Sequence, residues 1–154
     1  MLSDRPLGRI ISRSPDETGM PSHYTIDHDE RLVRVTGTGP LSDADLLEQR
    51  VRIRDDPAFD PGYSFLVDLT AVTEVLLSAQ VVARLARDPI STPGVRRAIV
   101  VPPAEPGASA PHPLAFGLGR VFQSIAALRG EDVEVFTDKQ LAVEWLRGGP
   151  APGY

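Results

Sequence analysis

Residues 64–87 read SFLVDLTAVTEVLLSAQVVARLAR and contain two successive apolar segments. The first segment, Ser64–Leu69, is continuously apolar at its centre and follows Pro61–Gly62, which is typical of a strand covered on both faces. In the second segment, Ala79–Arg87, apolar residues recur at helical spacing, and the segment ends shortly before Pro89. We therefore predict a central strand followed by a helix.

The alternation of predicted strands and helices continues on both sides of this stretch. Strand composition marks residues 24–26, 32–36, 97–101 and 133–136. Helical periodicity and end signals mark residues 42–55, 112–129 and 137–146. The predicted order is ββαβαβαβα. Because strands that alternate with helices imply right-handed crossovers, we predict an α/β fold with a mainly parallel sheet, flanking helices and an antiparallel N-terminal hairpin.

Three helix starts carry capping residues. Ser42 stands three residues before Asp45, which is a variant of the capping box. The pair His112–Pro113 places proline at the first helical position, where it is favoured. Thr137 stands three residues before Gln140, which predicts a second capping box.

The domain is expected to span residues 23–147, between flexible tails at 1–22 and 148–154. The first tail is polar and interrupted by proline and glycine, and its apolar pair Ile10–Ile11 is isolated. Met20 is an alternative initiator. The sequence contains neither a secretory signal pattern nor a transmembrane run, so we expect a cytoplasmic protein.

Composition excludes several classes of function. The 154 residues are 42% hydrophobic and 24% charged, which suits an ordinary folded domain. A net charge of −5 opposes binding to nucleic acid, which needs clustered Lys and Arg. The absence of cysteine excludes disulfides, thiolate nucleophiles and cysteine-ligated metals. The three histidines lack metal-site spacing, so we expect no metal and no cofactor.

Polar residues at the carboxyl ends of the predicted parallel strands form a candidate binding rim, because ligands of open α/β sheets bind there. These residues are Asp68, Thr70, Thr73, His112 and Thr137. The proline-rich loop at 102–113 is long enough to act as a lid, but we favour a proline-stiffened surface loop without a ligand. A catalytic triad would require Ser78, His112 and Asp68 to converge, which no local motif indicates.

The helix after this loop offers candidate pocket residues. Phe116, Val121 and Phe122 would line an apolar pocket between helix and sheet, or belong to the core. The glycines of Gly117-Leu118-Gly119 lack the third glycine of a dinucleotide motif and lie inside a helix, so we expect them to serve close packing.

The order of elements and four segments of the sequence resemble the STAS-like superfamily, particularly its bacterial SpoIIAA-like or SEC14-like branch. These segments are FLVDLTAVTEVLLSAQVVARLA, RRAIVVP, FGLGRVFQSI and VEVFTDKQLAVEWL. The resemblance implies a non-enzymatic module used in regulation or in sensing a lipid or another small ligand.

Anti-sigma-factor antagonists of this superfamily carry a phosphorylated serine in an Asp-Ser-Ser-Gly motif. Only Ser78 matches this motif here, because Leu76 and Ala79 replace the aspartate and the glycine. Ser78 is therefore a candidate phosphosite or partner contact, whereas its position before a predicted helix favours the structural role of an N-cap.

Two functions follow as hypotheses. The first is a non-catalytic STAS-like regulatory or protein-interaction module in bacterial signalling, which would contact a protein through the second helix, with a homodimer left open. The alternative is a SEC14-like binder of a lipid or other apolar small molecule. An apolar pocket would favour the binder, and an exposed apolar patch on the second helix would favour the interaction module.

Overall fold

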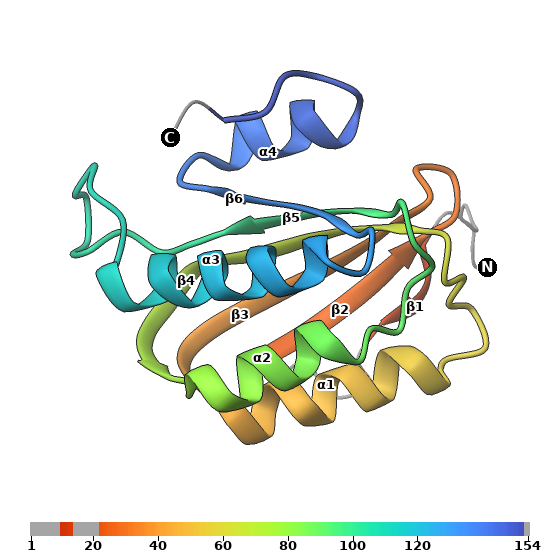
Figure 1. The fold of residues 1–154 in the computed structure, drawn as a ribbon, viewed down its shortest axis with the longest axis horizontal. Helices are drawn as coiled ribbons and strands as arrows, with labels where there is room; N and C mark the ends of the chain where they lie inside the picture. The colour runs from red at the N-terminus through yellow and green to blue at the C-terminus, as the bar shows by residue number, and fades with distance from the viewer. Residues whose placement is uncertain (1–9, 14–21, 153–154) are drawn as a thin grey trace.

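The structure, a computed structural model, describes residues 10–13 and 22–152, in which six strands form one sheet and four helices cover it (Figure 1). The strands are β1 (Ile10–Arg13), β2 (Ser22–Asp27), β3 (Leu32–Ser42), β4 (Ser64–Leu76), β5 (Arg96–Val100) and β6 (Asp132–Phe136). The helices are α1 (Asp43–Asp55), α2 (Ala79–Arg87), α3 (Pro113–Ala127) and α4 (Lys139–Leu146). The sheet order is β1-β2-β3-β4-β5-β6, so each strand lies beside its neighbour in sequence.

The sheet is antiparallel from β1 to β3 and parallel from β3 to β6. The predicted α/β class and the antiparallel hairpin of β2 and β3 are therefore confirmed. Helices α1, α2 and α3 connect successive parallel strands and lie together on one face, whereas α4 follows the last strand and covers the other face (Figure 1). Right-handed crossovers between consecutively ordered strands place their helices on one face, which explains this division.

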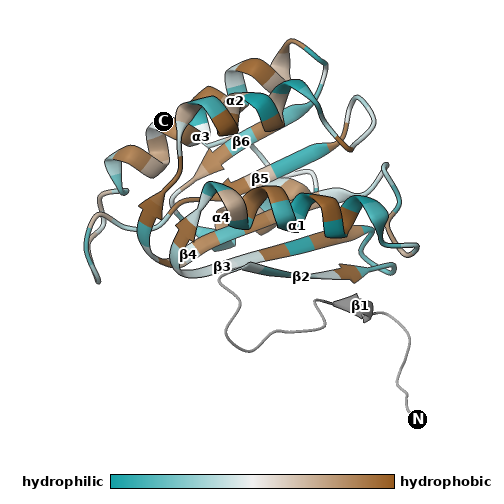
Figure 2. Cartoon of the chain, turned by 90° about the horizontal axis from the view of Figure 1, so that it is seen from below, coloured by the Kyte–Doolittle hydropathy of each residue, from teal (hydrophilic) through white to brown (hydrophobic). Residues whose placement is uncertain are grey.

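Strand β4 has helices on both faces, as its apolar centre predicts. Phe65 packs with Ile53 of α1 on one face, and Leu66 packs with Trp145 of α4 on the other. Figure 2 shows hydrophobic and hydrophilic residues interspersed along α1, as expected for a helix with one face on the sheet.

Strands β3 and β4 are longer than predicted. Their parallel pairing runs from Leu32 with Ser64 to Ser42 with Leu76, with register shifts between Thr36 and Thr38 and between Gly39 and Pro40. The sequence prediction ended β3 where glycines begin and ended β4 at its last continuously apolar residue. Both strands instead continue through bulges, where glycine is common because the backbone bends.

Strand β1 lies inside the range expected to be a flexible tail. Ile10–Arg13 pairs antiparallel with β2, with Arg13 opposite Thr25. A four-residue strand has no detectable period of its own, and the free edge of β2 supplies its hydrogen-bonding partner. The remainder of that tail, residues 1–9 and 14–21, lies outside the described residues.

The C-terminal range expected to be flexible begins with a helix cap. Gly148 has φ of 100°, and its N–H donates to the Trp145 carbonyl oxygen at 2.9 Å. The N–H of Gly149 donates to the Glu144 carbonyl oxygen at 2.9 Å. A glycine in the left-handed conformation commonly ends a helix in this way, so Gly148–Gly149 completes α4.

Two of the three predicted helix starts are confirmed. Ser42 Oγ accepts the Asp45 N–H at 3.3 Å, and Asp45 Oδ2 accepts the Ser42 N–H at 2.9 Å, which completes the capping box. His112 caps α3, ahead of proline at the first helical position. The prediction for Thr137 is wrong, because the N-cap of α4 is Asp138, whose carboxylate accepts two backbone N–H groups. A carboxylate one residue later is also favoured at the positive end of the helix.

The two glycines of α3 have different surroundings. A Cβ atom on Gly119 would lie 3.1 Å from Val135 Cγ2 and 3.3 Å from Val135 Cγ1 on β6. A Cβ atom on Gly117 would meet nothing within 4 Å. The expected close packing is thus confirmed for Gly119 and wrong for Gly117.

Candidate functional site

The predicted rim residues do not converge on a single site. Asp68 joins β4 to α4, because its Oδ2 lies 3.0 Å from Lys139 Nζ. Its Oδ1 accepts the Thr70 N–H at 3.0 Å and the Thr70 hydroxyl at 2.6 Å. Burial raises the pKa of Asp68, but the bonds from Thr70 and Lys139 outweigh burial and leave this pKa below its ordinary value. Asp68 is therefore an ionised anchor with both oxygens engaged.

Apart from Thr70, which binds Asp68, the predicted rim residues belong to separate local structures. Thr70 and Thr73 belong to the extended β4 and not to a loop after it, and Thr73 is exposed. His112 Nδ1 accepts the Ala115 N–H at 3.3 Å, so its side chain closes the first turn of α3. Thr137 is exposed between β6 and α4. The rim is a series of local caps and turns.

The loop after β5 closes on itself. Pro103 and Pro111 form an antiparallel bridge, and the Ala104 N–H donates to the Ala110 carbonyl oxygen at 2.8 Å. In Figure 1 this loop projects beyond the end of the sheet, between β5 and α3. It has the form of a short hairpin and does not cover the rim.

Ser78 occupies the structural position that its sequence context favours. Its Oγ accepts the Val81 N–H at 3.1 Å, which caps α2. Its own N–H donates to Asp43 Oδ1 at 2.8 Å, so the start of α2 is tied to the start of α1. A phosphate on Ser78 would stand beside the Asp43 carboxylate, and this neighbour disfavours added negative charge.

The three residues of the hypothetical catalytic triad take part in separate contacts. Ser78 caps α2, His112 caps α3 and Asp68 pairs with Lys139. Within the described residues, no hydrogen bond joins any two of the three. The geometry that nucleophilic catalysis requires is not assembled by these side chains.

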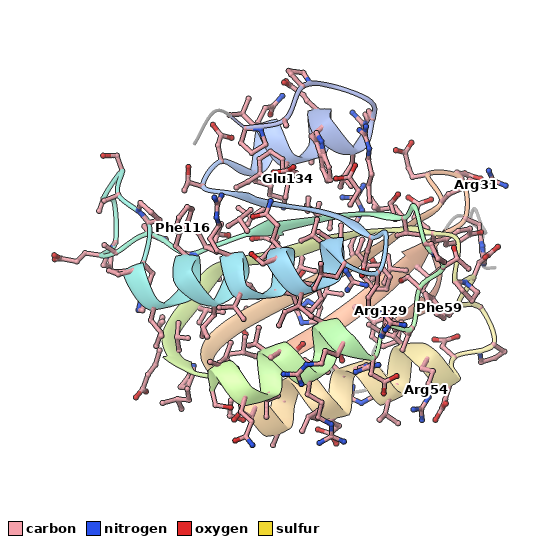
Figure 3. All side chains as sticks on the ribbon, in the orientation of Figure 1. Arg31, Arg54, Phe59, Phe116, Arg129 and Glu134 are labelled. Atoms are coloured by element: carbon pink, nitrogen blue, oxygen red, sulfur yellow. The ribbon has the colours of Figure 1, made fainter. Side chains whose placement is uncertain are left out.

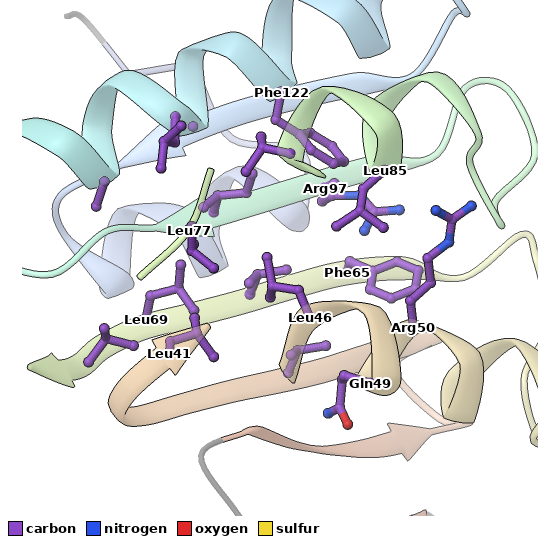
Figure 4. Close-up of a pocket in the computed structure, with 18 of the residues that line it drawn as sticks. Leu41, Leu46, Gln49, Arg50, Phe65, Leu69, Leu77, Leu85, Arg97 and Phe122 are labelled. Atoms are coloured by element: carbon purple, nitrogen blue, oxygen red, sulfur yellow. The ribbon is translucent and has the colours of Figure 1, made fainter. Parts of the chain in front are cut away.

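A cavity of about 160 Å³ lies between the sheet and helices α1, α2 and α3, which share one face of it (Figure 4). Side chains of β3, β4 and β5 line it on one side, and side chains of α1, α2 and α3 line it on the other. Leu41, Leu69 and Leu77 lie at one end of the cavity in Figure 4. Most of the lining is aliphatic or aromatic, which is typical of a site for a small ligand.

Two guanidinium groups lie at the opposite end of the cavity (Figure 4). Arg97 extends from β5, where its Nε donates to Glu131 Oε2 at 2.8 Å and its Nη2 donates to Ser91 Oγ at 3.3 Å. Its guanidinium carbon lies 4.2 Å from the centre of the Phe65 ring, and a second ring, that of Phe122, lies at 5.4 Å. These contacts hold Arg97 in place.

Arg50 extends from α1 and is less well paired. Its side chain is 19% exposed, and its Nη2 lies 3.7 Å from Oδ2 of Asp88, whose side chain is 85% exposed. Burial lowers the pKa of Arg50, Asp88 opposes this effect, and the positive charges of Arg97, Arg54 and Arg84 add to it. The protein thus holds a partly desolvated cation among other cations.

Gln49 is an unsatisfied polar group in the cavity wall. Its side chain is on the inner face of α1, the residue is 4% exposed, and both Nε2 and Oε1 lack a hydrogen-bond partner. Buried polar groups are nearly always hydrogen-bonded, so this amide requires a water molecule or a ligand.

The cavity corrects the predicted pocket lining. Phe122 lines the cavity, but Phe116 and Val121 do not. Phe116, near the start of α3 in Figure 3, packs instead against the cluster that contains Val133 and Val135. The prediction chose three apolar residues of the helix without regard to its faces, whereas only the face with Ala115, Leu118, Gly119 and Phe122 reaches the cavity.

Sequence reasoning missed Gln49, Arg50 and Arg97. A signal for them exists in the sequence, because all three interrupt patterns that predict burial. Gln49 and Arg50 lie between Leu46 and Ile53 on the inner side of a helix, and Arg97 directly precedes the buried apolar residues of β5. A charged or amide residue at such a position points to a function or a buried pair.

No protein-family model matches the chain, and no curated protein matches its sequence. The resemblance to the STAS-like superfamily therefore stays a prediction. In the described part of the chain, no helix has the length and apolar character to cross a membrane. Over the same residues, no three His, Asp or Glu side chains are grouped so that they could hold a metal ion.

Proposed function

We propose that the chain is a non-catalytic binding module whose cavity takes up an apolar small molecule, which was the alternative of the two sequence hypotheses. The observation that carries the proposal is the apolar cavity between α1, α2, α3 and the sheet. An engineered apolar cavity of about 150 Å³ stays dry and binds benzene, so a cavity of about 160 Å³ is sufficient for a ligand of that size.

The volume also limits the ligand. Sites for drug-sized molecules measure about 300–1,000 Å³, so this cavity suits a body of about six to eight carbon atoms and not a whole phospholipid. The proposal is therefore a small-molecule binder and not a carrier of intact lipids.

The surface of α2 favours a small-molecule binder over a module that docks a protein through this helix. The exposed residues of α2 are Ala79, Gln80, Arg84 and Arg87, which are small, polar or charged. Its larger apolar residues face the protein interior, and Val82 and Leu85 line the cavity. A module that docked a protein through α2 would need an apolar patch there.

The STAS-like family is part of the proposal. The order ββαβαβαβα over β2 to α4, with Ser78 as the N-cap of α2, supports it. In such a module the cavity would convert the presence of a small molecule into a change in the packing of α1 and α2 on the sheet.

Titration with benzene and 1-hexanol, followed by NMR of the valine and leucine methyl groups, tests the proposal. We expect saturable shifts confined to methyl groups of the cavity, such as those of Val72, Val82 and Leu85. Ala115→Leu adds atoms at the cavity wall and should weaken binding, whereas Ala127→Leu adds the same atoms at an exposed position of the same helix. Absence of saturation, or binding that Ala115→Leu leaves unchanged, would refute the proposal.

A further inference from the structure

We infer that the cavity selects a small monocarboxylate, with its carboxylate at Arg50 and its apolar body of about six carbon atoms toward Leu41 and Leu69. This inference rests on the proposed function, because it specifies the ligand of the same cavity.

The distribution of polarity along the cavity supports an amphipathic ligand. In Figure 4 leucine side chains gather at one end, while the guanidinium groups of Arg50 and Arg97 lie at the other. A wholly apolar ligand would leave these guanidinium groups without a new partner. A ligand with one anionic end would match both ends of the cavity.

The balance of charge at the polar end indicates one negative charge on the ligand. Arg97 is neutralised by Glu131, and both of these side chains are largely buried. Within the described part of the chain, the carboxylate beside Arg50 is that of Asp88, at 3.7 Å and almost fully in solvent, where the pairing is weak. The charge of Arg50 is therefore only weakly compensated, and a monoanion would balance it.

The geometry of arginine favours a carboxylate as that anion. A guanidinium group presents parallel N–H donors that match the two oxygens of a carboxylate. Among the described residues, no hydrogen bond uses the donors of Arg50, because its contact with Asp88 is longer than a hydrogen bond. The neighbouring cations Arg54 and Arg84 increase the attraction for an anion.

Gln49 is a second polar residue of the cavity wall, and its side chain has no hydrogen-bonding partner. Its amide is buried and unpaired, one residue before Arg50 on α1. An unsatisfied buried amide costs free energy unless a water molecule or a ligand reaches it. Gln49 is thus a second polar side chain of α1 with unmet hydrogen-bonding capacity, although in Figure 4 its amide points away from Arg50.

Calorimetric titration of the full chain with hexanoate, 1-hexanol and hexylammonium at pH 7 tests the inference. These probes share a six-carbon body and differ in charge. A charge-assisted hydrogen bond contributes about 1.5–3 kcal/mol, so hexanoate should bind about 10- to 100-fold more tightly than 1-hexanol. Hexylammonium should bind more weakly than either.

Substitution of Arg50 separates the contribution of its charge to ligand affinity from the contribution of the apolar cavity. Arg50→Gln should reduce the affinity for hexanoate to near that for 1-hexanol and should change the affinity for 1-hexanol much less. Arg50→Lys keeps the charge but loses the planar donors, so an intermediate loss is expected. Arg87→Gln is the control, because Arg87 is an exposed cation of α2 outside the cavity wall.

The outcomes distinguish this inference from the proposed function. Equal affinity of the wild-type chain for hexanoate and 1-hexanol would overturn the inference and leave the proposed function standing, and this comparison requires no variant. An equal loss of hexanoate binding in Arg50→Gln and Arg87→Gln would overturn it as well. Absence of binding by all three probes would overturn both.

Discussion

Replacing Gly119 with alanine should destabilise the protein, whereas the same replacement at Gly117 should stabilise it. Both residues lie inside α3, where alanine is favoured over glycine by about 1 kcal/mol. At Gly117 nothing lies within 4 Å of the added Cβ atom, so the full gain is expected. At Gly119 the Cβ atom would meet both methyl groups of Val135, at 3.1 and 3.3 Å.

The crowding at Gly119 has no simple relief. Val135 is 1% exposed and pairs with Ile99 of β5, so its side chain has little room to move away. Because both methyl groups are close, rotation of the side chain would exchange one contact for another. Overpacking in a core costs about 1–3 kcal/mol, so the two variants should differ by about 1–3 kcal/mol or slightly more in free energy of unfolding.

Urea unfolding followed by the fluorescence of Trp145, which is buried against the sheet, measures this difference. An unchanged dependence on urea would show that the midpoints report stability alone. If Gly119→Ala proved as stable as Gly117→Ala, the close approach of α3 to β6 would be refuted.

Three further predictions concern single polar contacts. Ser78→Ala should lower the free energy of unfolding by about 1 kcal/mol in urea unfolding, because α2 loses its N-cap. The carboxylate of Asp68 has a depressed pKa in the folded state, so it contributes stability above about pH 4 that is lost as the pH falls through this lower pKa. The stability advantage of the wild type over Asp68→Asn, measured by urea midpoints from pH 7 to pH 2, should therefore shrink in acid; a constant difference would contradict the pairing with Lys139. Glu131→Gln should cost about 3–5 kcal/mol, because it leaves the charge of Arg97 buried without its partner, and a thermal midpoint like that of the wild type would contradict this.

Elements with a local signal were predictable. The capping box of Ser42 and Asp45 and the proline after His112 act within one turn of helix, so their residues are close in the sequence. The apolar centre of β4 predicted a strand covered on both faces for the same reason, since alternate residues point to opposite faces.

Elements that depend on a partner strand were not predictable. The extension of β4 to Leu76 requires β3 beside it, and the bulges that accommodate Gly39 and Pro40 leave no periodic pattern. Strand β1 depends on the free edge of β2. At α4 the sequence preference for a polar N-cap residue was ambiguous, because threonine and aspartate both suit an N-cap. Only the backbone conformation selects Asp138 over Thr137.

The amino-acid sequence by itself determined the α/β class, the order of strands and helices from β2 onward, and the capping of α1 and α3, because short-range periodicity and caps act between neighbouring residues. Only the tertiary structure decided the cavity and its charged end. Arg50 and Arg97 are 47 positions apart in the numbering, and they line the same cavity only because the folded chain places α1 and β5 on its border. A binding site assembled from three helices and three strands has no counterpart along the chain.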